Sequence, residues 1–268
     1  MKVKLGVVFW LSAAFLALLA LGALIGPYVL PDPNKSLGAS FVPAGQGYLL
    51  GTDEQGRDIL SRLVTGARFS LLIGLTTQAL ALLIGVTVGV LGEMGPKWLA
   101  TPLMRFTDGM FAFPDLLLAI LIVGIFGAGV FPVIVALAIT GWPSIARLVR
   151  GQVATLKERE FVQASLALGA KKTYVVVKHI LPHLIGLLLA VSMVDLAAVI
   201  LSESTLSFLG IGVQPPDPSW GQMINIARQS IFSNPVLLVW PCLVLSMTIF
   251  ALNFVGDGLR TLTDPRSR

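Results

Sequence analysis

The sequence has few charged residues, and this scarcity excludes an ordinary soluble domain. Aspartate, glutamate, lysine and arginine make up 12% of the 268 residues, whereas hydrophobic residues make up 55%. Soluble domains carry about 25% charged residues. Uncharged apolar runs here reach or exceed the ~18 to 20 residues that span a bilayer core. The composition therefore predicts a polytopic membrane protein.

Cysteine, histidine and catalytic motifs are also scarce. The one cysteine, Cys242, lies inside an apolar run, which excludes a disulfide framework and a clustered thiolate metal site. His179 and His183 are four residues apart, but two ligands do not complete a metal site, and none is expected. The chain contains no Gly-Lys dipeptide, hence no Walker A loop, and neither G-x-S-x-G nor H-E-x-x-H. We expect a chain that is not an enzyme.

Six apolar runs are expected to cross the membrane. The first follows Lys2 and Lys4, exceeds the apolar core of a secretory signal and is not closed by an A-x-A site, so we expect a retained helix. Prolines within the runs predict kinks, because neighbouring groups can satisfy the freed carbonyls. The expected spans are residues 5–26, 69–92, 110–127, 129–146, 184–202 and 235–256.

The basic residues are distributed unevenly between the expected loops. With the N-terminus in the cytoplasm, 14 of the 19 lysines and arginines lie in residues 1–4, 93–109, 147–183 and the C-terminal tail. This distribution follows the positive-inside rule and places both termini in the cytoplasm. The net charge of +5 is thereby explained by topology, and nucleic-acid binding is not expected.

The largest expected cytoplasmic segment joins the fourth and fifth spans. Thr155–Glu158 fits a capping box, which predicts a short helix beginning near Leu156. Gly169 can adopt the left-handed conformation that ends a helix. A second helix is expected over residues 171–181, before Pro182. The segment is either an amphipathic hairpin on the membrane surface or a docking turn that inserts small residues into a groove on a cytoplasmic partner.

The string "QASLALGAKKTYVVVKHILP" resembles the cytoplasmic loop motif of bacterial ABC importer permeases. That motif reads Glu-Ala-Ala, three residues, Gly, nine residues, Ile, any residue, Leu-Pro. Ala164, Gly169, Leu181 and Pro182 match it, whereas Gln163 stands at the glutamate position. The resemblance implies that the loop docks on ATPase subunits through Glu158, Phe161, Gln163, Ala164, Ser165, Ala167, Leu168, Gly169, Ala170 and Lys171.

Two further strings narrow the family. "LGTDEQGRDILSRLVTGARFSLLIG" and "LSESTLSFLGIGVQPPDPSWGQMI", with "GDGLRTLTDPR" near the end, resemble the peptide and nickel importer permeases. They are most similar to the second permease subunit of dipeptide and oligopeptide systems. The resemblance implies an all-α membrane protein with six transmembrane helices in the type I ABC importer permease fold. Residues 1–268 would form a single permease domain, with a cytoplasmic coupling-helix loop over residues 155–182 between the fourth and fifth helices.

The same resemblance implies the partners of the chain. It would pair with a homologous second permease in the bacterial cytoplasmic (inner) membrane, contact lipid and bind no cofactor itself. Two cytoplasmic ABC ATPase subunits would bind ATP and Mg, and an extracytoplasmic binding protein would deliver di- or oligopeptides. Nickel chelates, glutathione and haem are alternative cargoes carried by relatives. A stand-alone secondary transporter or channel is the alternative class, which would predict a repeated half with interrupted helices, or charged relays at mid-membrane.

Polar side chains at membrane depth are costly unless they are paired or hydrated, so they are candidates for the substrate path. Asp195, near the middle of the fifth span, is the main candidate, and a structural pairing with another helix is its alternative. Asp115 and Asn253 are weaker candidates. Glu203 lies near the outer end of the same span as Asp195.

The two external loops carry further signals. In "GTDEQGRDILSR", Thr52 or Asp53 is expected to cap an interfacial helix through Ile59. Contact with the partner permease or with a binding protein is the functional alternative. In "GIGVQPPDPSWG", Trp220 is expected to anchor the chain at the lipid interface.

Overall fold

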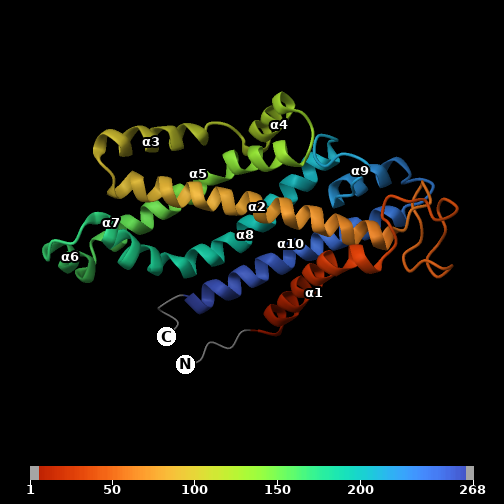
Figure 1. Cartoon of the computed structure of the whole chain (residues 1–268), viewed down its shortest axis with the longest axis horizontal. Helices are drawn as coiled ribbons and strands as arrows, with labels where there is room; N and C mark the ends of the chain where they lie inside the picture. The colour runs from red at the N-terminus through yellow and green to blue at the C-terminus, as the bar shows by residue number, and fades with distance from the viewer. Residues whose placement is uncertain (1–5, 264–268) are drawn as a thin grey trace.

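Long apolar helices build most of the structure, a computed structural model that describes residues 6–263 (Figure 1). The first residues and the end of the basic tail, both used for the orientation, lie outside this range. Within it no strand forms, apart from one isolated bridge between Thr52 and Asp58. Five helices are long and apolar enough to cross a bilayer: α1 (Val7–Val29), α2 (Ile59–Met94), α5 (Val130–Lys157), α8 (Leu181–Phe208) and α10 (Val236–Thr263).

Shorter helices lie at the ends and along one side of this bundle. α6 and α7 lie at one end of the molecule, towards which α1 begins and α10 ends, whereas residues 30–58 and α9 lie at the other end (Figure 1). α7 runs through the π-helical segment η1 into α8 without a break, so a single apolar helix extends from Lys172 to Phe208. The short elements are α3 (Lys97–Met110), α4 (Asp115–Phe126), α6 (Glu160–Ala167), α7 (Lys172–Val175), η1 (Val176–Ile180) and α9 (Trp220–Gln229).

The expected third span, residues 110–127, is not one straight helix. α3 and α4 are bent by 94° at a short break, and the pair counts as a span only if both helices are taken together. α4 has 12 residues, about 18 Å at 1.5 Å per residue, which is shorter than a bilayer core of ~30 Å. The break lies at "FAFP": Pro114 precedes α4 with extended backbone, and a residue before proline disfavours the helical region.

Two helix boundaries also differ from the prediction, because each helix continues beyond its apolar run into a polar segment. α2 begins ten residues before the expected position 69, where the Asp58 side chain accepts a hydrogen bond from the Ser61 N–H. The expected cap at Thr155 is wrong. α5 continues through this residue to Lys157, and the Thr155 hydroxyl donates to the Gly151 carbonyl at 3.1 Å. The next helix, α6, begins at Glu160.

α2 and α5 pack closely because α2 presents small residues to α5. A Cβ atom added at Gly85 would lie 2.6 Å from Cβ of Ile145, and one added at Gly89 would lie 2.6 Å from the Ala146 carbonyl oxygen. Spacing of this kind lets membrane helices approach closely, where packing replaces the hydrophobic effect as the source of association. These two helices form the centre of the bundle on which the remaining elements are arranged (Figure 1).

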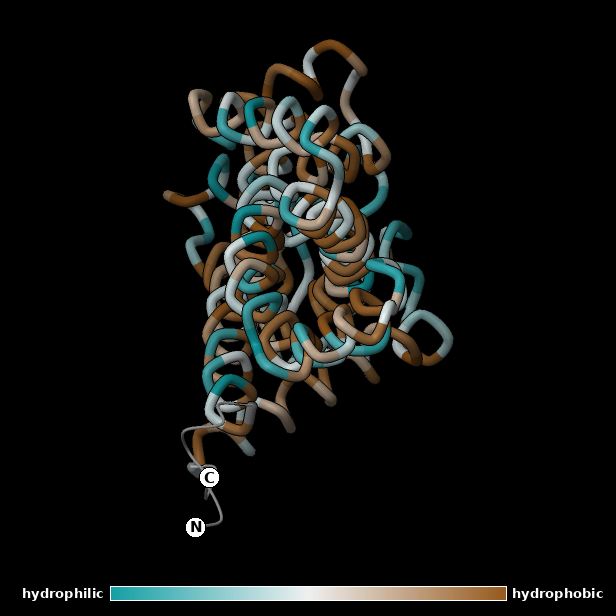
Figure 2. The backbone as a smooth tube through the Cα atoms, turned by 90° about the vertical axis from the view of Figure 1, so that its left-hand side faces the viewer, coloured by the Kyte–Doolittle hydropathy of each residue, from teal (hydrophilic) through white to brown (hydrophobic). Residues whose placement is uncertain are grey.

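Apolar side chains cover much of the outer surface as well as the interior. Trp10, Leu72, Phe131 and Phe250 lie on four different long helices and are each more than half exposed. Figure 2 looks along the bundle from the α6 end and shows helices that are largely apolar, with hydrophilic residues in the connections. A surface of this kind suits lipid or another apolar chain, so the structure is that of a multi-pass membrane protein.

Candidate functional site

The α6 turn is anchored by one buried residue and otherwise exposed. Val162 is fully buried and packs with Val153, Val175, Ile180 and Leu184 from α5, α7, η1 and α8. Sequence reasoning did not single out Val162, although its apolar neighbours on the same turn signal a packed face. α6 is therefore held against four neighbouring elements through a single apolar contact region.

Gly169 ends α6 as predicted. Its φ is +86°, the left-handed region that glycine adopts without steric penalty. The Ala170 N–H donates to the Ser165 carbonyl and the Gly169 N–H to the Leu166 carbonyl, which is the hydrogen-bond pattern of a Schellman motif. The motif turns the chain sharply and leaves the Leu168 side chain 89% exposed.

Ten residues were expected to form a docking surface, and the structure brings them together on this protruding turn. Eight of the ten, Leu168 among them, are exposed, and Ser165 and Ala170 are half-buried. Phe161 is the inner edge of the group: its ring stacks on His183 at a centroid distance of 5.0 Å. Beside it a groove of about 930 Å³ runs between α6 and the neighbouring ends of α5, α8 and α10.

A polar chain links α6 to α5 and α2. The Gln163 Nε2 atom donates to the Lys157 carbonyl, the last residue of α5, at 2.6 Å. The Lys157 ammonium group pairs with Glu93 near the end of α2, and Arg150 pairs with the other oxygen of Glu93 at 3.3 Å. Gln163 therefore satisfies one of the free carbonyls at a helix end, a role that the glutamate of the motif could not fill because a carboxylate has no hydrogen to donate.

Two of the three expected path residues line one open cavity between α2, α4, α5 and α8, here called the central cavity. Asp195 lies at the midpoint of α8, and Asp115 begins α4. Both line a cavity of about 220 Å³, together with Gln78 of α2. Asn253 does not line it; its side chain donates to the Ile249 carbonyl in its own helix at 2.8 Å. Thr140, Ser144 and Ser202 add hydroxyl groups to the wall.

Glu203 is a structural residue. It is completely buried, and its two carboxylate oxygens accept hydrogen bonds from Ser70 of α2 at 3.0 Å and from Ser207 at 2.8 Å. The Ser207 hydroxyl oxygen in turn accepts the Val213 N–H at 3.1 Å, so the carboxylate ties α2 and α8 to the following loop. The serines on both helices were a signal of this cluster that the sequence reasoning did not use.

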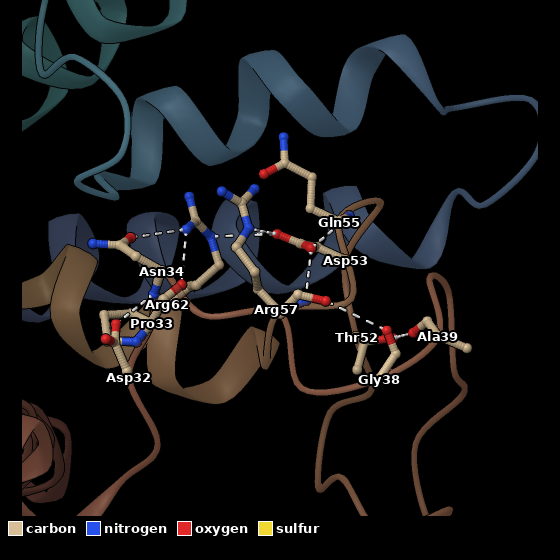
Figure 3. Close-up of polar contacts among 11 residues, drawn as sticks. Asp32, Pro33, Asn34, Gly38, Ala39, Thr52, Asp53, Gln55, Arg57 and Arg62 are labelled. Atoms are coloured by element: carbon tan, nitrogen blue, oxygen red, sulfur yellow. Dashed lines mark hydrogen bonds and ion pairs between the residues drawn. The ribbon is translucent and has the colours of Figure 1, made fainter.

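At the end opposite α6, residues 30–58 fold around a buried ionic cluster (Figure 3). The Asp53 carboxylate pairs with Arg57 at 2.7 Å and with Arg62 at 3.5 Å. Arg62 also donates to the Pro33 carbonyl at 3.0 Å. Asp53 therefore holds the loop together through these two ion pairs. It does not cap a helix; the residue that caps α2 is Asp58.

The expected position of Trp220 at the lipid interface is also wrong. Its side chain is fully buried, and its indole N–H donates to the Leu63 carbonyl of α2 at 3.1 Å. Gly66 leaves space for this ring, since a Cβ added there would lie 3.2 Å from it. The loop before α9 thus closes inwards onto α2.

Helices that suit a membrane, a polar cavity among them and a protruding turn at one end are the features of a membrane transport subunit. Among the described residues, no group of acidic, histidine or cysteine side chains could hold a metal ion. Residues 81–268 match the family described as "Binding-protein-dependent transport system inner membrane component". The chain belongs to this family, whose members are membrane permeases and not catalytic subunits.

Several curated relatives cover most of the chain. It is 37% identical to the oligopeptide transport system permease protein OppC of Haemophilus influenzae, over 90% of this chain and 78% of the relative. It is 39% identical to the di/tripeptide transport system permease protein DppC of Pseudomonas aeruginosa, over 94% and 86% respectively. It is also 39% identical to the glutathione transport system permease protein GsiD of Pectobacterium atrosepticum, over 81% and 72%.

A solved structure supports the expected fold. A chain from inward-facing crystals of the MetNI methionine ABC transporter superposes with a TM-score of 0.63, over 76% of this chain and 96% of that one. The two sequences are 20% identical, so the likeness concerns the fold alone. The family match and the curated relatives confirm the resemblance to ABC importer permeases that the loop motif and the long strings indicated.

Proposed function

We propose that this chain is the second permease subunit of an ABC importer that moves di- or oligopeptides across the bacterial cytoplasmic membrane. The peptide cargo is inferred from the sequence identity of 37% to 39% to relatives named as oligopeptide and di/tripeptide permeases. Glutathione is the second candidate cargo, favoured by the similarity to GsiD. It is itself a peptide, so a related site could accept it.

In the proposed assembly the α6 end faces the cytoplasm. Residues 1–268 act as one permease domain beside a homologous second permease, with two ABC ATPase subunits below it and a binding protein at the outer end. ATP and Mg bind to the ATPases, and this chain holds no cofactor. The clustering of basic residues at one end supports this orientation, since cytoplasmic loops carry an excess of lysine and arginine.

The α6 turn is the proposed coupling helix. Its exposed face, from Glu158 to Lys171, would insert into a groove on an ATPase subunit. Its inner face is fixed by Val162 and by the hydrogen bond from Gln163 to the end of α5. A displacement of α6 would therefore move α5, α2 and α8 together and change access to the central cavity.

Crosslinking tests this docking directly. In a Cys242→Ser background, an Ala167→Cys variant should crosslink to a cysteine placed in the ATPase groove of the assembled importer, because Ala167 lies on the exposed face of α6. The matched control is Gln46→Cys, an exposed position in the segment of residues 30–58 at the other end of the molecule, and it should give no product. Absence of the Ala167→Cys product in an importer with wild-type uptake would contradict the docking.

Coupling is tested at Gly169. A Gly169→Leu variant places a side chain at φ +86°, which costs about 1 to 2 kcal/mol and alters the turn. ATP hydrolysis should continue while peptide uptake falls. Gly169→Asn, which tolerates this conformation, should retain uptake, and so should Gly151→Leu, where the added side chain meets open space. Wild-type uptake by Gly169→Leu would argue against a tightly fitted turn.

A further inference from the structure

An open groove of about 510 Å³ lies at the end of α2, between that helix, α3 and the second half of α5. α3 begins at the α6 end of the molecule and runs back beside α2 and α5 (Figure 1). The groove shares no lining residue with the groove beside α6 or with the central cavity. Three basic side chains line it: Lys97, Arg105 and Arg150.

The acidic residues of this groove are already neutralised by basic neighbours. Asp108 of α3 pairs with Arg147 of α5 at 3.0 Å. Glu93 of α2 pairs with Arg150 at 3.3 Å and also with Lys157. Neither carboxylate is therefore left to balance a further positive charge.

Two of the basic residues in the groove have no such partner. Lys97 and Arg105 are both exposed, and neither takes part in an ion pair within the described part of the chain. Both line the same groove, so their positive charges act on one region of space. The groove therefore favours an anionic partner.

An apolar stripe runs along α3 beside the basic residues. Lys97, Thr101 and Arg105 are spaced by four residues, so they share one side of the helix, and all three line the groove. Trp98 and Phe106 each follow one residue after a member of this stripe, and they are 77% and 61% exposed. A partner that covers both stripes must be anionic beside the first and apolar beside the second.

The groove lies at the depth of phospholipid headgroups. At 1.5 Å per residue, Glu93 is about 19 Å along α2 from the middle of the apolar run 69–92. Headgroups lie roughly 15 to 22 Å from the centre of a bilayer. From this level α3 runs back beside the apolar part of α2, and Phe106 lies about 14 Å along it from Lys97 (Figure 1).

We propose that this groove binds an anionic phospholipid, with its phosphate against Lys97 and Arg105 and an acyl chain along Trp98 and Phe106. Basic pockets of this kind, between transmembrane helices, bind anionic lipid headgroups. A free phosphate would match the basic stripe and leave the apolar one uncovered. In the proposed orientation the lipid belongs to the cytoplasmic leaflet, and its binding does not depend on the nature of the cargo.

Quenching of Trp98 fluorescence tests the proposal in the full chain, reconstituted in phosphatidylcholine nanodiscs. A minor fraction of the lipid is replaced by phosphatidylglycerol or by phosphatidylcholine that carries bromine atoms near the glycerol end of one acyl chain. The difference between the parent and Trp98→Phe separates this residue from the other four tryptophans. We expect the anionic brominated lipid to quench Trp98 about threefold more than the neutral one, since nearby basic residues favour anionic lipid.

Removal of the two unpaired charges should abolish this preference. With Lys97→Gln and Arg105→Gln together, both brominated lipids should quench Trp98 equally. The matched control, Lys172→Gln with Lys178→Gln, removes the same charge from exposed positions outside the groove and should keep the preference. In the parent itself, about 1 M salt should weaken the preference, because the Debye length falls to ~3 Å.

Equal quenching by the two lipids in the parent would overturn the proposal, and so would a preference that survives the loss of Lys97 and Arg105. The same measurement in the assembled importer distinguishes lipid from protein at this surface. A retained preference supports the lipid, whereas its loss on assembly would show that another subunit covers the groove and would contradict the proposal. Peptide uptake tests the proposed function separately, so each can fail without the other.

Discussion

At the scale of single residues, Gln163 shows how a departure from a motif acquires a physical meaning. The motif has glutamate at this position, and the sequence alone could not say what a glutamine does there. In the structure the glutamine amide donates to the last carbonyl of α5 at 2.6 Å. The neutral side chain also avoids placing a negative charge at a helix C-terminus, where the helix dipole is already negative.

Gln163→Glu should therefore loosen α6. The variant loses a hydrogen bond worth about 1 kcal/mol and adds repulsion from the end of α5. We expect faster amide hydrogen exchange over residues 160–168, by roughly fivefold, in both Gln163→Glu and Gln163→Ala. Gln152→Glu, on α5 and outside this hydrogen bond, is the control. Unchanged exchange in Gln163→Glu would show that this contact does not hold the turn.

Arg62 provides a second prediction at this scale. It is 2% exposed and bridges Asp53 to the Pro33 carbonyl. Arg62→Leu should leave both acceptors without this donor and destabilise residues 30–58 by about 2 kcal/mol. Limited proteolysis of that loop should become faster. In the control variant Arg68→Leu, which changes an exposed residue, the protease should cleave the loop at the wild-type rate. Equal resistance of the two variants would contradict the structural role of the cluster.

At the scale of elements, glycines decide how closely the two central helices pack. Gly85 and Gly89 lie one turn apart on α2 and meet Ile145 and the Ala146 carbonyl of α5. The approach leaves no space for a side chain, because an added Cβ atom would lie 2.6 Å from each of these neighbours. The α2–α5 contact thus depends on the absence of side chains rather than on particular apolar ones.

Gly89→Leu should separate these helices. Forcing a side chain into a packed interface costs about 1 to 3 kcal/mol, and here the obstacle is backbone. The thermal unfolding midpoint of the purified chain in detergent should fall by several degrees. Gly22→Leu in α1, where an added Cβ meets nothing within 4 Å, should leave the midpoint near that of the wild type. A similar midpoint for both variants would contradict the close packing.

Hydropathy predicted the membrane-spanning helices well, since each long helix contains an expected apolar run. It did not predict α3, because residues 93–109 were expected to form a cytoplasmic connection, and it did not predict the 94° bend between α3 and α4. It also misplaced Trp220, since an aromatic residue in an outer loop suits burial as well as a lipid interface. Gly169 was predicted correctly because a positive φ leaves a direct mark on residue type.

The central cavity was also partly predictable from residue type. A carboxylate in the middle of an apolar run, such as Asp195, is visible in the sequence. Asp115 was also named from the sequence. That it shares a cavity with Asp195, Gln78 and Thr140 could not be predicted, because these residues come from four helices whose rotation depends on tertiary packing. Asn253, the other weaker candidate, forms a hydrogen bond within α10.

At the scale of the whole molecule, the chain is organised from one end to the other. α6 protrudes at one end, and the Asp53 cluster closes residues 30–58 at the other end (Figures 1 and 3). The cavity is lined by Asp195, which lies midway along α8. α2 links the three regions, because it carries Arg62 of the Asp53 cluster, Gln78 of the cavity wall and Glu93 of the polar chain to α6. Motion applied at α6 would therefore reach the cavity through rigid, closely packed elements.

The central claim is that this chain forms a path for peptides only when ATPase subunits drive it. The most direct measurement is uptake of labelled dialanine into proteoliposomes containing either the purified chain alone or the complete importer with its binding protein. We predict uptake only with the complete importer and ATP, and none with the chain alone. Peptide flux through the chain alone, without ATP, would contradict the account and favour a stand-alone transporter or channel.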